Sequence, residues 1–251
     1  MRYAFYSRPY LRPETQGTLT LGRNLRTIGE SAFCESTYTG SLTIPDSVVE
    51  IGKRAFYQCE NLNGTLTLGR SLRTIGKEAF YWCAFTGSLT IPEGVAEIAD
   101  GAFSSLYQRD GMFNGTLTLP STLKTIGAEV FAYTDFSGEL LIPDGVTSIG
   151  ANAFAECDGF GGTLSLPDSV KTVGASAFYM CKGFTGLKLP AGLTKIEMRS
   201  FAHMYGLQTE VVIPEGVTEL GEGAFSCSHM SSVSLPSTLK KSESRRFSLP
   251  D

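Results

Sequence analysis

The chain has 251 residues, of which 42% are apolar and 18% are charged, and its formal net charge is -4. These values exclude a disordered or collagen-like chain, and they imply no general attraction to nucleic acid or to anionic lipid. No apolar run approaches the ~18 residues that a membrane span needs, so we expect no membrane insertion.

The first sixteen residues, MRYAFYSRPYLRPETQ, look like the end of a repeat unit and lack the apolar core of a signal peptide. We therefore expect residues 1–16 to be a partial N-terminal repeat, and the chain to be a fragment or shortened relative of a longer exported protein. A terminal unit without a polar cap would leave a strand edge open, which makes end-to-end self-association possible.

Residues 17–241 repeat at intervals of 23 or 24 residues, apart from one insertion at residues 104–114. The interval is set by a recurring phenylalanine in AF-like dipeptides. Phenylalanines 98 residues apart also match one another, which indicates that a block of four units was duplicated, insertion included. The recurring residues are Phe5, Phe33, Phe56, Phe80, Phe103, Phe131, Phe154, Phe178, Phe201 and Phe225.

Each unit contains the same succession of elements, shown by GTLTLGRSLRTIGKEAFYWC from Gly64 to Cys83. The TLTL segment alternates with period two and predicts a short strand with one buried face. Leu72 and Ile75 form a second apolar pair, followed by a glycine suited to a turn. The segment KEAFYWC has room for about one helical turn before the chain returns.

A unit of this size cannot bury its apolar face alone, but stacked units can. The pattern therefore predicts a repeat solenoid with a spine of phenylalanines and a parallel β-sheet on one face. Short strands, turns and single helical turns are expected on the other side. About nine strands at ~4.8 Å spacing would give an arc of roughly 40 to 45 Å.

The pattern L-x-x-L-x-L-P…V-x-x-I-G-x-x-A-F-x-x-C resembles the BspA-type leucine-rich repeat of bacterial and protist surface proteins. FTGLKLPAGLTKIEMRSF (residues 184–201) and MSSVSLPSTLKK (residues 230–241) match its spacing best. The resemblance implies a right-handed α/β-type solenoid that is secreted or lies at the cell surface. It also implies a non-enzymatic role in adhesion or protein binding, with a host extracellular-matrix or cell-surface protein as a candidate partner.

The exposed side chains of the TLTL strands form the first candidate binding surface. In the first half of the chain they are hydroxyl-bearing residues such as Thr67, Thr90 and Thr118, whereas Leu141 and Lys188 interrupt the pattern in the second half. One interpretation is that threonine simply suits an exposed strand. A second is protein binding by this face. A third is a lattice or glycan binder resembling ice-binding β-solenoids, which would use the regular Thr/Ser ladder.

The turn side is the second candidate surface, because the aromatic residues gather there. Tyr81, Trp82 and the insertion with Tyr107, Arg109 and Asp110 are the residues most typical of a protein-binding hot spot. A rim of semi-buried tyrosines over the phenylalanine spine is an equal alternative. Residues 81–180 also carry eleven Asp/Glu against three Lys/Arg. Such a stretch is either a solvated face or a docking site for a basic partner.

Nothing in the sequence indicates catalysis, a metal or a cofactor. Cys59, Cys83, Cys157 and Cys181 all lie three residues after the repeated phenylalanine, so we expect a structural ladder of small apolar residues, with a Cys59–Cys83 bridge left open. Cys34 and Cys227 lie outside this register and are expected to be partly exposed. His203 and His229 are expected to be exposed turn residues.

The final ten residues, 242–251, depart from the repeat. Ser242 replaces the usual core isoleucine, and the polar run ESRRFSLPD follows. We expect this degenerate segment to act as a makeshift polar cap.

Overall fold

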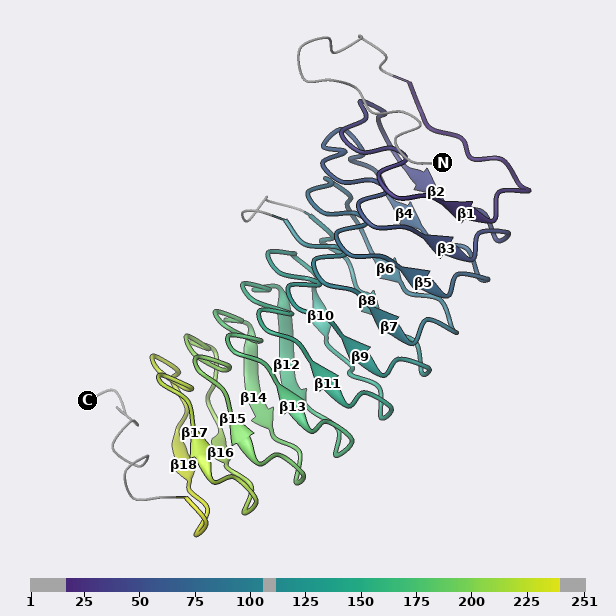
Figure 1. The fold of residues 1–251 in the computed structure, drawn as a ribbon. Helices are drawn as coiled ribbons and strands as arrows, with labels where there is room; N and C mark the ends of the chain where they lie inside the picture. Colours follow the sequence, from purple (N-terminus) through teal and green to yellow (C-terminus); the bar gives the residue numbers. More distant parts are fainter. Residues whose placement is uncertain (1–16, 106–111, 240–251) are drawn as a thin grey trace.

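The computed structural model describes residues 17–105 and 112–239. The described chain forms one stack of coils, with its strands running side by side from the N-terminal to the C-terminal end (Figure 1). It contains 18 strands and, among the described residues, no helix. The predicted segments at residues 1–16 and 242–251, and the insertion residues Tyr107, Arg109 and Asp110, lie outside the described residues.

The predicted TLTL strands form the first of two strand rows. Most of these strands place a leucine or valine in the core and the neighbouring residues in solvent, as with Leu66 and Thr67 of β4 and as the period of two requires. The pairing is parallel, as predicted, and joins β2 to β4, β6 to β8, β10 through β12 to β14, and β16 to β18. The row consists of β2 (Leu42–Thr43), β4 (Leu66–Thr67), β6 (Leu89–Thr90), β8 (Leu117–Thr118), β10 (Gly138–Glu139), β12 (Phe160–Ser165), β14 (Phe184–Lys188), β16 (Glu210–Val212) and β18 (Ser232–Ser234).

A second strand row arises where the sequence pattern indicated only an apolar pair. It contains a continuous parallel sheet of seven strands, the odd-numbered strands from β1 to β13, and the pair β15–β17. In each strand the first residue faces solvent to some degree and the second is buried, as with Thr74 and Ile75. The row consists of β1 (Thr27–Ile28), β3 (Glu50–Ile51), β5 (Thr74–Ile75), β7 (Glu97–Ile98), β9 (Thr125–Ile126), β11 (Ser148–Ile149), β13 (Thr172–Val173), β15 (Lys195–Ile196) and β17 (Glu219–Leu220).

The predicted helical turn is wrong: the AF-containing segments are successive tight turns. In the third unit, the N–H groups of Glu78, Phe80 and Trp82 donate to carbonyls of the next coil, at 2.8 to 2.9 Å. A helix would direct those N–H groups to its own carbonyls. The alternation is possible because Glu78 and Trp82 adopt φ values of 56° and 58°. The turn side is thus hydrogen-bonded between coils, in the manner of a sheet.

The predicted phenylalanine spine is confirmed. Successive rings from Phe33 to Phe225 are stacked, with centroids 5.1 to 5.7 Å apart. A second column, which the sequence analysis did not identify, contacts the first edge to face. Its fully buried aromatic members are Phe85, Phe113, Phe136, Phe160 and Phe184.

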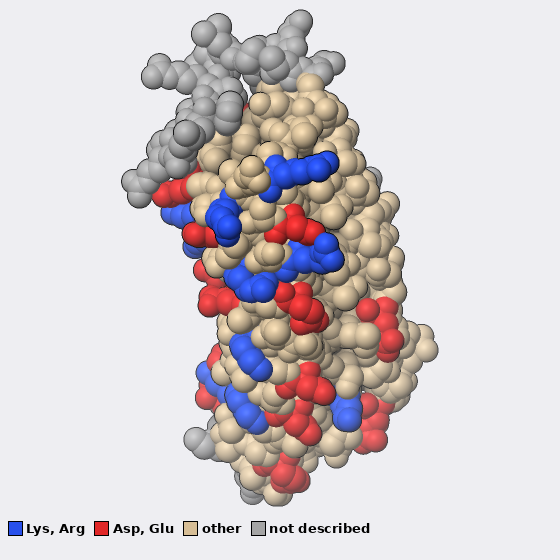
Figure 2. All heavy atoms as spheres, turned by 90° about the vertical axis from the view of Figure 1, so that its right-hand side faces the viewer, with Lys and Arg blue, Asp and Glu red and all other residues tan. Residues whose placement is uncertain are grey.

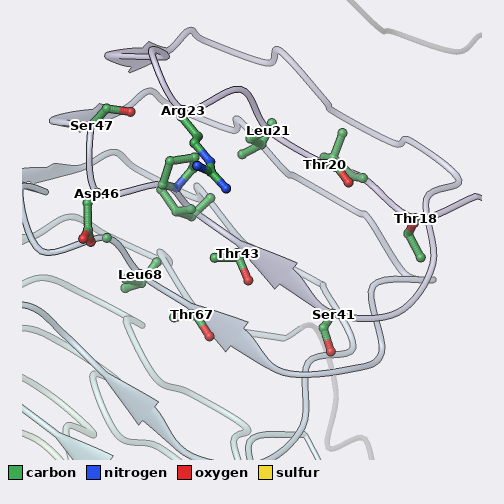
Figure 3. A pocket seen from close by; sticks show the side chains of 14 residues that line it. Thr18, Thr20, Leu21, Arg23, Ser41, Thr43, Asp46, Ser47, Thr67 and Leu68 are labelled. Atoms are coloured by element: carbon green, nitrogen blue, oxygen red, sulfur yellow. The ribbon is translucent and has the colours of Figure 1, made fainter.

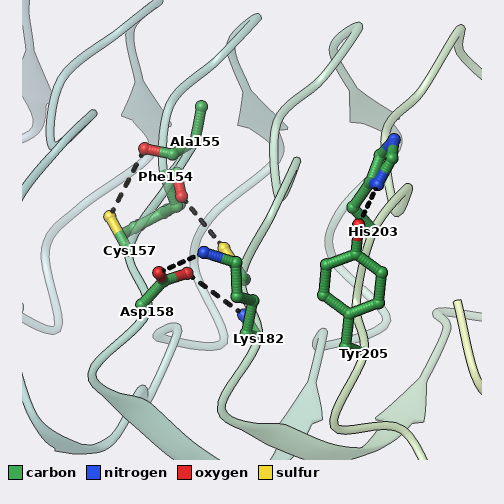
Figure 4. A network of polar contacts seen from close by, with 8 residues as sticks. Phe154, Ala155, Cys157, Asp158, Lys182, His203 and Tyr205 are labelled. Carbon is green, nitrogen blue, oxygen red and sulfur yellow. Dashed lines mark hydrogen bonds and ion pairs between the residues drawn. The ribbon is translucent and has the colours of Figure 1, made fainter. Parts of the chain in front are cut away.

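The cysteine ladder is structural, and none of the six cysteines, all of which lie in the described residues, forms a disulfide bridge. Cys157 donates to the carbonyl of Phe131 at 3.0 Å. Cys181 donates to the carbonyl of Phe154 at 3.0 Å (Figure 4). Ser228 makes the same bond, at 2.8 Å to Phe201. In these coils the position holds a small side chain that donates a hydrogen bond to the preceding coil, whereas the buried Met204 fills the same position with an apolar side chain.

The two cysteines outside that register differ. Cys227 is exposed, as predicted, but Cys34 is buried. Cys34 directly follows Phe33 in the first complete turn segment, and burial raises the pKa of its thiol to about 11.

Candidate interaction surfaces

The exposed face of the first strand row, called here the strand face, is a regular hydroxyl ladder in its N-terminal half. Thr43 pairs in register with Thr67, and Thr90 pairs with Thr118. A shallow hollow of about 710 Å³ lies over β2, β4 and the segment before them. The side chains of Thr43 and Thr67 project from neighbouring strands beside Ser41 (Figure 3). This half presents methyl and hydroxyl groups at nearly constant spacing.

Part of that ladder is occupied by its own hydrogen bonds. The Thr65 hydroxyl donates to Ser41 at 3.2 Å, and Thr116 does the same to Ser88. One hydroxyl of each unit is therefore engaged with the equivalent hydroxyl of the neighbouring unit in these two pairs, and the outer threonines carry most of the remaining hydrogen-bonding capacity.

In its C-terminal half the strand face carries apolar side chains. Leu141 is 67% exposed and Val212 is 57% exposed, at positions where the N-terminal units have threonine. Lys188, on β14, is exposed between them in the order of the coils. Burying large apolar side chains stabilises a complex, whereas leaving them in water does not. This half therefore differs in chemistry from the hydroxyl ladder on the same face.

Charged residues of both signs are interleaved on the face seen at the right-hand edge of Figure 1, and Figure 2 shows no extended basic patch there. Several charges pair between coils, as Arg70 does with Asp46 at 2.7 Å and Lys195 with Glu219 at 3.1 Å. Pairs this exposed contribute little to stability. Their alternation gives the face no field of a single sign.

The turn side carries a broken ladder of aromatic residues. Tyr57 and Tyr81 stack with centroids 5.3 Å apart and planes 8° from parallel. In the next three coils, the residue after the repeated phenylalanine is small: Ser104, Ala132 and Ala155. A tyrosine returns only at Tyr179. The gap is a hollow of about 380 Å³, called here the turn-side hollow. It is lined by Tyr81, Ser104, Ser105, Glu129, Ala132, Tyr133, Asn152, Ala155, Glu156, Ser176, Tyr179 and Arg199.

Beyond Tyr179 the aromatic contacts continue toward the C-terminal coils. Tyr179 contacts His203 edge to face, and Tyr205 contacts both His203 and His229. The Tyr205 hydroxyl and His203 Nδ1 are hydrogen-bonded at 2.6 Å (Figure 4). His229 is exposed, as predicted, but His203 is only half-buried rather than exposed. The histidines thus belong to a surface aromatic cluster.

The predicted site residues fall on two separate surfaces. Thr67, Thr90, Thr118, Leu141 and Lys188 lie on the strand face, and all five are exposed. Tyr81 forms one wall of the turn-side hollow, whereas Trp82 is half-buried and does not line it. The hollow itself was missed. Its sequence signal is the run of small residues that interrupts the tyrosines after the repeated phenylalanine.

The described residues show no metal site and no membrane-crossing helix. No group of three or more His, Cys, Asp or Glu side chains in residues 17–105 and 112–239 lies close enough to hold a metal ion. Over the same residues no helix has the length and apolarity to cross a bilayer.

A parallel β-solenoid with one ladder of core residues for each position of the repeat is the architecture of solenoid repeat proteins, a class that includes the leucine-rich repeat proteins. The model of the BspA type Leucine rich repeat region (6 copies) matches residues 2–110, 26–161 and 160–249. Because these matches cover nearly the whole sequence, the chain belongs to the BspA-type leucine-rich repeat family. The resemblance predicted from the sequence is thereby confirmed. None of the curated proteins matches the chain.

One solved structure shows the same fold, and two others are similar at lower scores. A leucine-rich repeat protein of T. pallidum, TpLRR, is 23% identical, with a TM-score of 0.52, over 87% of this chain and 85% of that one. A leucine-rich cell surface protein of Faecalibacterium prausnitzii A2-165 is 24% identical, with a TM-score of 0.42, over 89% and 81%. The pneumococcal vaccine antigen PcpA is 18% identical, with a TM-score of 0.47, over 94% and 82%.

Proposed function

We propose that this chain is a non-enzymatic protein-binding module of a cell-surface or secreted protein, acting in adhesion through the C-terminal half of its strand face. The observation that carries the proposal is the exposure of Leu141 and Val212, at 67% and 57%, where equivalent N-terminal positions hold threonine. Membership of the BspA-type family supports the assignment to the class of protein-binding modules.

The physical basis is the removal of this apolar surface from water. A partner that covered Leu141 and Val212 would bury two large side chains, each contributing about 1.5 to 3 kcal/mol if buried fully. Lys188, on the coil preceding Val212 along the same face, would add a charged contact that orients the partner. Ser165, on the coil between Leu141 and Lys188, and Ser234, on the coil after Val212, would add polar contacts.

The test measures binding of the purified chain to immobilised fibronectin and fibrinogen across a salt series. We expect saturable binding that survives moderate salt, and at least tenfold weaker binding by the double variant Leu141→Thr/Val212→Thr. Both substitutions restore the residue that the N-terminal units use, so the variant should fold normally. Thr67→Ser, on the other half of the face, is the matched control and should bind as the parent does.

Two results would contradict the proposal. One is the absence of saturable binding to either protein at tens of micromolar. The other is equal binding by the parent chain and the double variant, which would exclude this half of the face.

A second candidate function is binding of a lattice or a glycan by the N-terminal hydroxyl ladder. It is favoured by the in-register pairs Thr43–Thr67 and Thr90–Thr118 and by the hollow over the first of these pairs. Replacing Thr67 and Thr90 by lysine would abolish that activity and leave the apolar half intact. Thermal hysteresis and binding to a glycan array are the corresponding measurements.

A further inference from the structure

We propose that the turn-side hollow binds an arginine side chain of a protein partner, held against Tyr81 and Glu129. The inference rests on the proposed function only in taking its ligand from a protein. The site lies on a different side of each coil from Leu141 and Val212, so the two can be tested independently.

The first argument is the interrupted aromatic stack. Because Tyr81 stacks on Tyr57 of the preceding coil with nearly parallel planes, its other ring face is turned toward the following coil. That coil offers only Ser104 at the equivalent position, and Tyr81 lines the hollow. One aromatic face is therefore left open, at a place where the repeat would otherwise put another ring. A planar group of similar thickness fits there.

The second argument is charge. Glu129 and Glu156 line the hollow, and neither has an ion-pair partner among the described residues. Burial, the neighbouring Tyr57 and then Glu129 raise the pKa of Tyr81 to about 12, which places that carboxylate within electrostatic reach of the ring. The hollow also lies in the acidic part of the chain. A cation is the complementary ligand.

The third argument is an unsatisfied polar atom. Ser105 is only 2% exposed and lines the hollow, and within residues 17–105 and 112–239 its hydroxyl oxygen has no hydrogen-bond partner. Buried hydroxyls are nearly always paired in native structures, so each exception calls for an explanation. A ligand with several N–H donors would pair with this oxygen while it contacts the carboxylate.

These features select arginine over lysine. The guanidinium is planar, stacks on aromatic faces and carries five N–H donors, whereas an ammonium is a compact and strongly hydrated charge. The methyl groups of Ala132 and Ala155 give the aliphatic stem an apolar surface to lie on. Arg199 lies on the coil beyond Tyr179, so its positive charge directs an incoming cation to the Tyr81 end.

The experiment titrates the full chain with three short capped peptides of the form Gly-Gly-X-Gly-Gly, in which X is arginine, lysine or citrulline. Binding is followed by tyrosine NMR shifts at low salt. For arginine we expect saturation with a Kd on the order of 1 mM. We expect at least fivefold weaker binding of lysine and no saturation with citrulline, which keeps the planar shape but lacks the charge.

Two variants locate the site. Ser104→Tyr extends the aromatic ladder as Tyr57 and Tyr81 do in their coils, and it should fill the hollow and abolish binding. Glu129→Gln should weaken binding at least fivefold without changing the melting temperature. Glu210→Gln, on the exposed strand face, is the charge-matched control and should bind as the parent does.

Three outcomes would overturn the proposal. They are equal binding of the citrulline and arginine peptides, unchanged binding by Ser104→Tyr and Glu129→Gln, or no saturable shift up to about 20-fold above the expected Kd. The Leu141→Thr/Val212→Thr variant should retain arginine binding. Its loss of fibronectin or fibrinogen binding alone would therefore separate failure at one site from failure at the other.

Discussion

The two copies of the duplicated block have nearly the same core and different surfaces. Core residues 98 positions apart are the same, as for Phe56 and Phe154 or Cys59 and Cys157, and all four are fully buried. On the strand face, by contrast, Thr43 of the first copy corresponds to Leu141 of the second. The core positions are held by contacts with neighbouring coils on both sides, whereas an exposed side chain contacts few neighbours and is free to change.

The same divergence created the turn-side hollow. Tyr57 of the first copy corresponds to Ala155 of the second, while Tyr81 corresponds to Tyr179. A ladder that is aromatic in two adjacent coils of the first copy is therefore interrupted before it resumes in the second. Both candidate sites thus arise where the second copy departs from the first, on a scaffold that the departure does not disturb.

The strongest test of core equivalence is to remove one spine ring from each copy. Phe56→Ala and Phe154→Ala should each lower the free energy of unfolding by about 3 to 5 kcal/mol, because each leaves a cavity in a fully buried stack. The loss should be larger at Phe154, which also contacts Phe160 edge to face, whereas the second column holds Leu62 beside Phe56. Urea unfolding of both variants measures the difference. A larger loss at Phe56 would contradict the contact geometry.

The cysteine ladder gives a second comparison, in which we expect smaller losses of unfolding free energy than for the spine variants. Cys157→Ala removes one of two donors to the Phe131 carbonyl, which keeps the Thr134 hydroxyl at 2.7 Å, and should cost about 0.5 to 1.5 kcal/mol. Cys59→Ala removes the same bond to Phe33 and should cost the same within about 0.5 kcal/mol. Cys157→Ser is the matched control and should cost less, because Ser228 makes this bond natively. Equal losses for Ala and Ser would show that the bond is immaterial.

Alkaline pH should destabilise the second copy through the same thiol. Burial raises the pKa of Cys157 from 9.0 to about 12, so the folded state keeps the neutral thiol while the unfolded state ionises. Stability is unaffected below pH 9 and falls between pH 9 and 12, by about 1.4 kcal/mol for each pH unit from this one group. Urea unfolding at pH 8 and pH 10 should show a smaller loss for Cys157→Ser than for the parent. An equal loss would assign the effect to other groups.

The fold was predictable from the sequence because each core position recurs about nine times along the chain. The TLTL strands and the Phe33–Phe225 spine follow from that regularity. The second strand row was not predicted, since Thr74–Ile75 is two residues long and pairs only between coils, where no local alternation marks it. The helical turn was predicted wrongly because positive φ is uncommon at non-glycine residues, and the side chains of Glu78 and Trp82 give no sign that these positions adopt it.

The candidate sites were predictable only in part. Leu141 and Lys188 were identified because they break a regular ladder at positions known to face solvent. The turn-side hollow was missed because small residues create it. Ala132 and Ala155 stand out only when they are aligned with the tyrosines at the equivalent positions of other coils. An interruption in a repeat is therefore as informative as a conspicuous side chain.

The smallest effect is expected from an ion pair that only the first copy possesses. Arg54 pairs with Glu78, and the corresponding residues of the second copy are Asn152 and Ser176. Glu78→Gln should lower the free energy of unfolding by at most about 1 kcal/mol, because the pair is partly exposed and screened by water. The loss should shrink at high salt, while the contact of Arg54 with the Tyr57 ring at 5.0 Å remains. Urea unfolding at low and high salt measures both quantities.

A loss above about 2 kcal/mol would mean that this surface position helps to hold the coil together, and that the second copy compensates elsewhere for having lost it. A loss below 1 kcal/mol would agree with a scaffold whose stability resides in the stacked core, which leaves its surface open to the changes that produced Leu141 and the turn-side hollow.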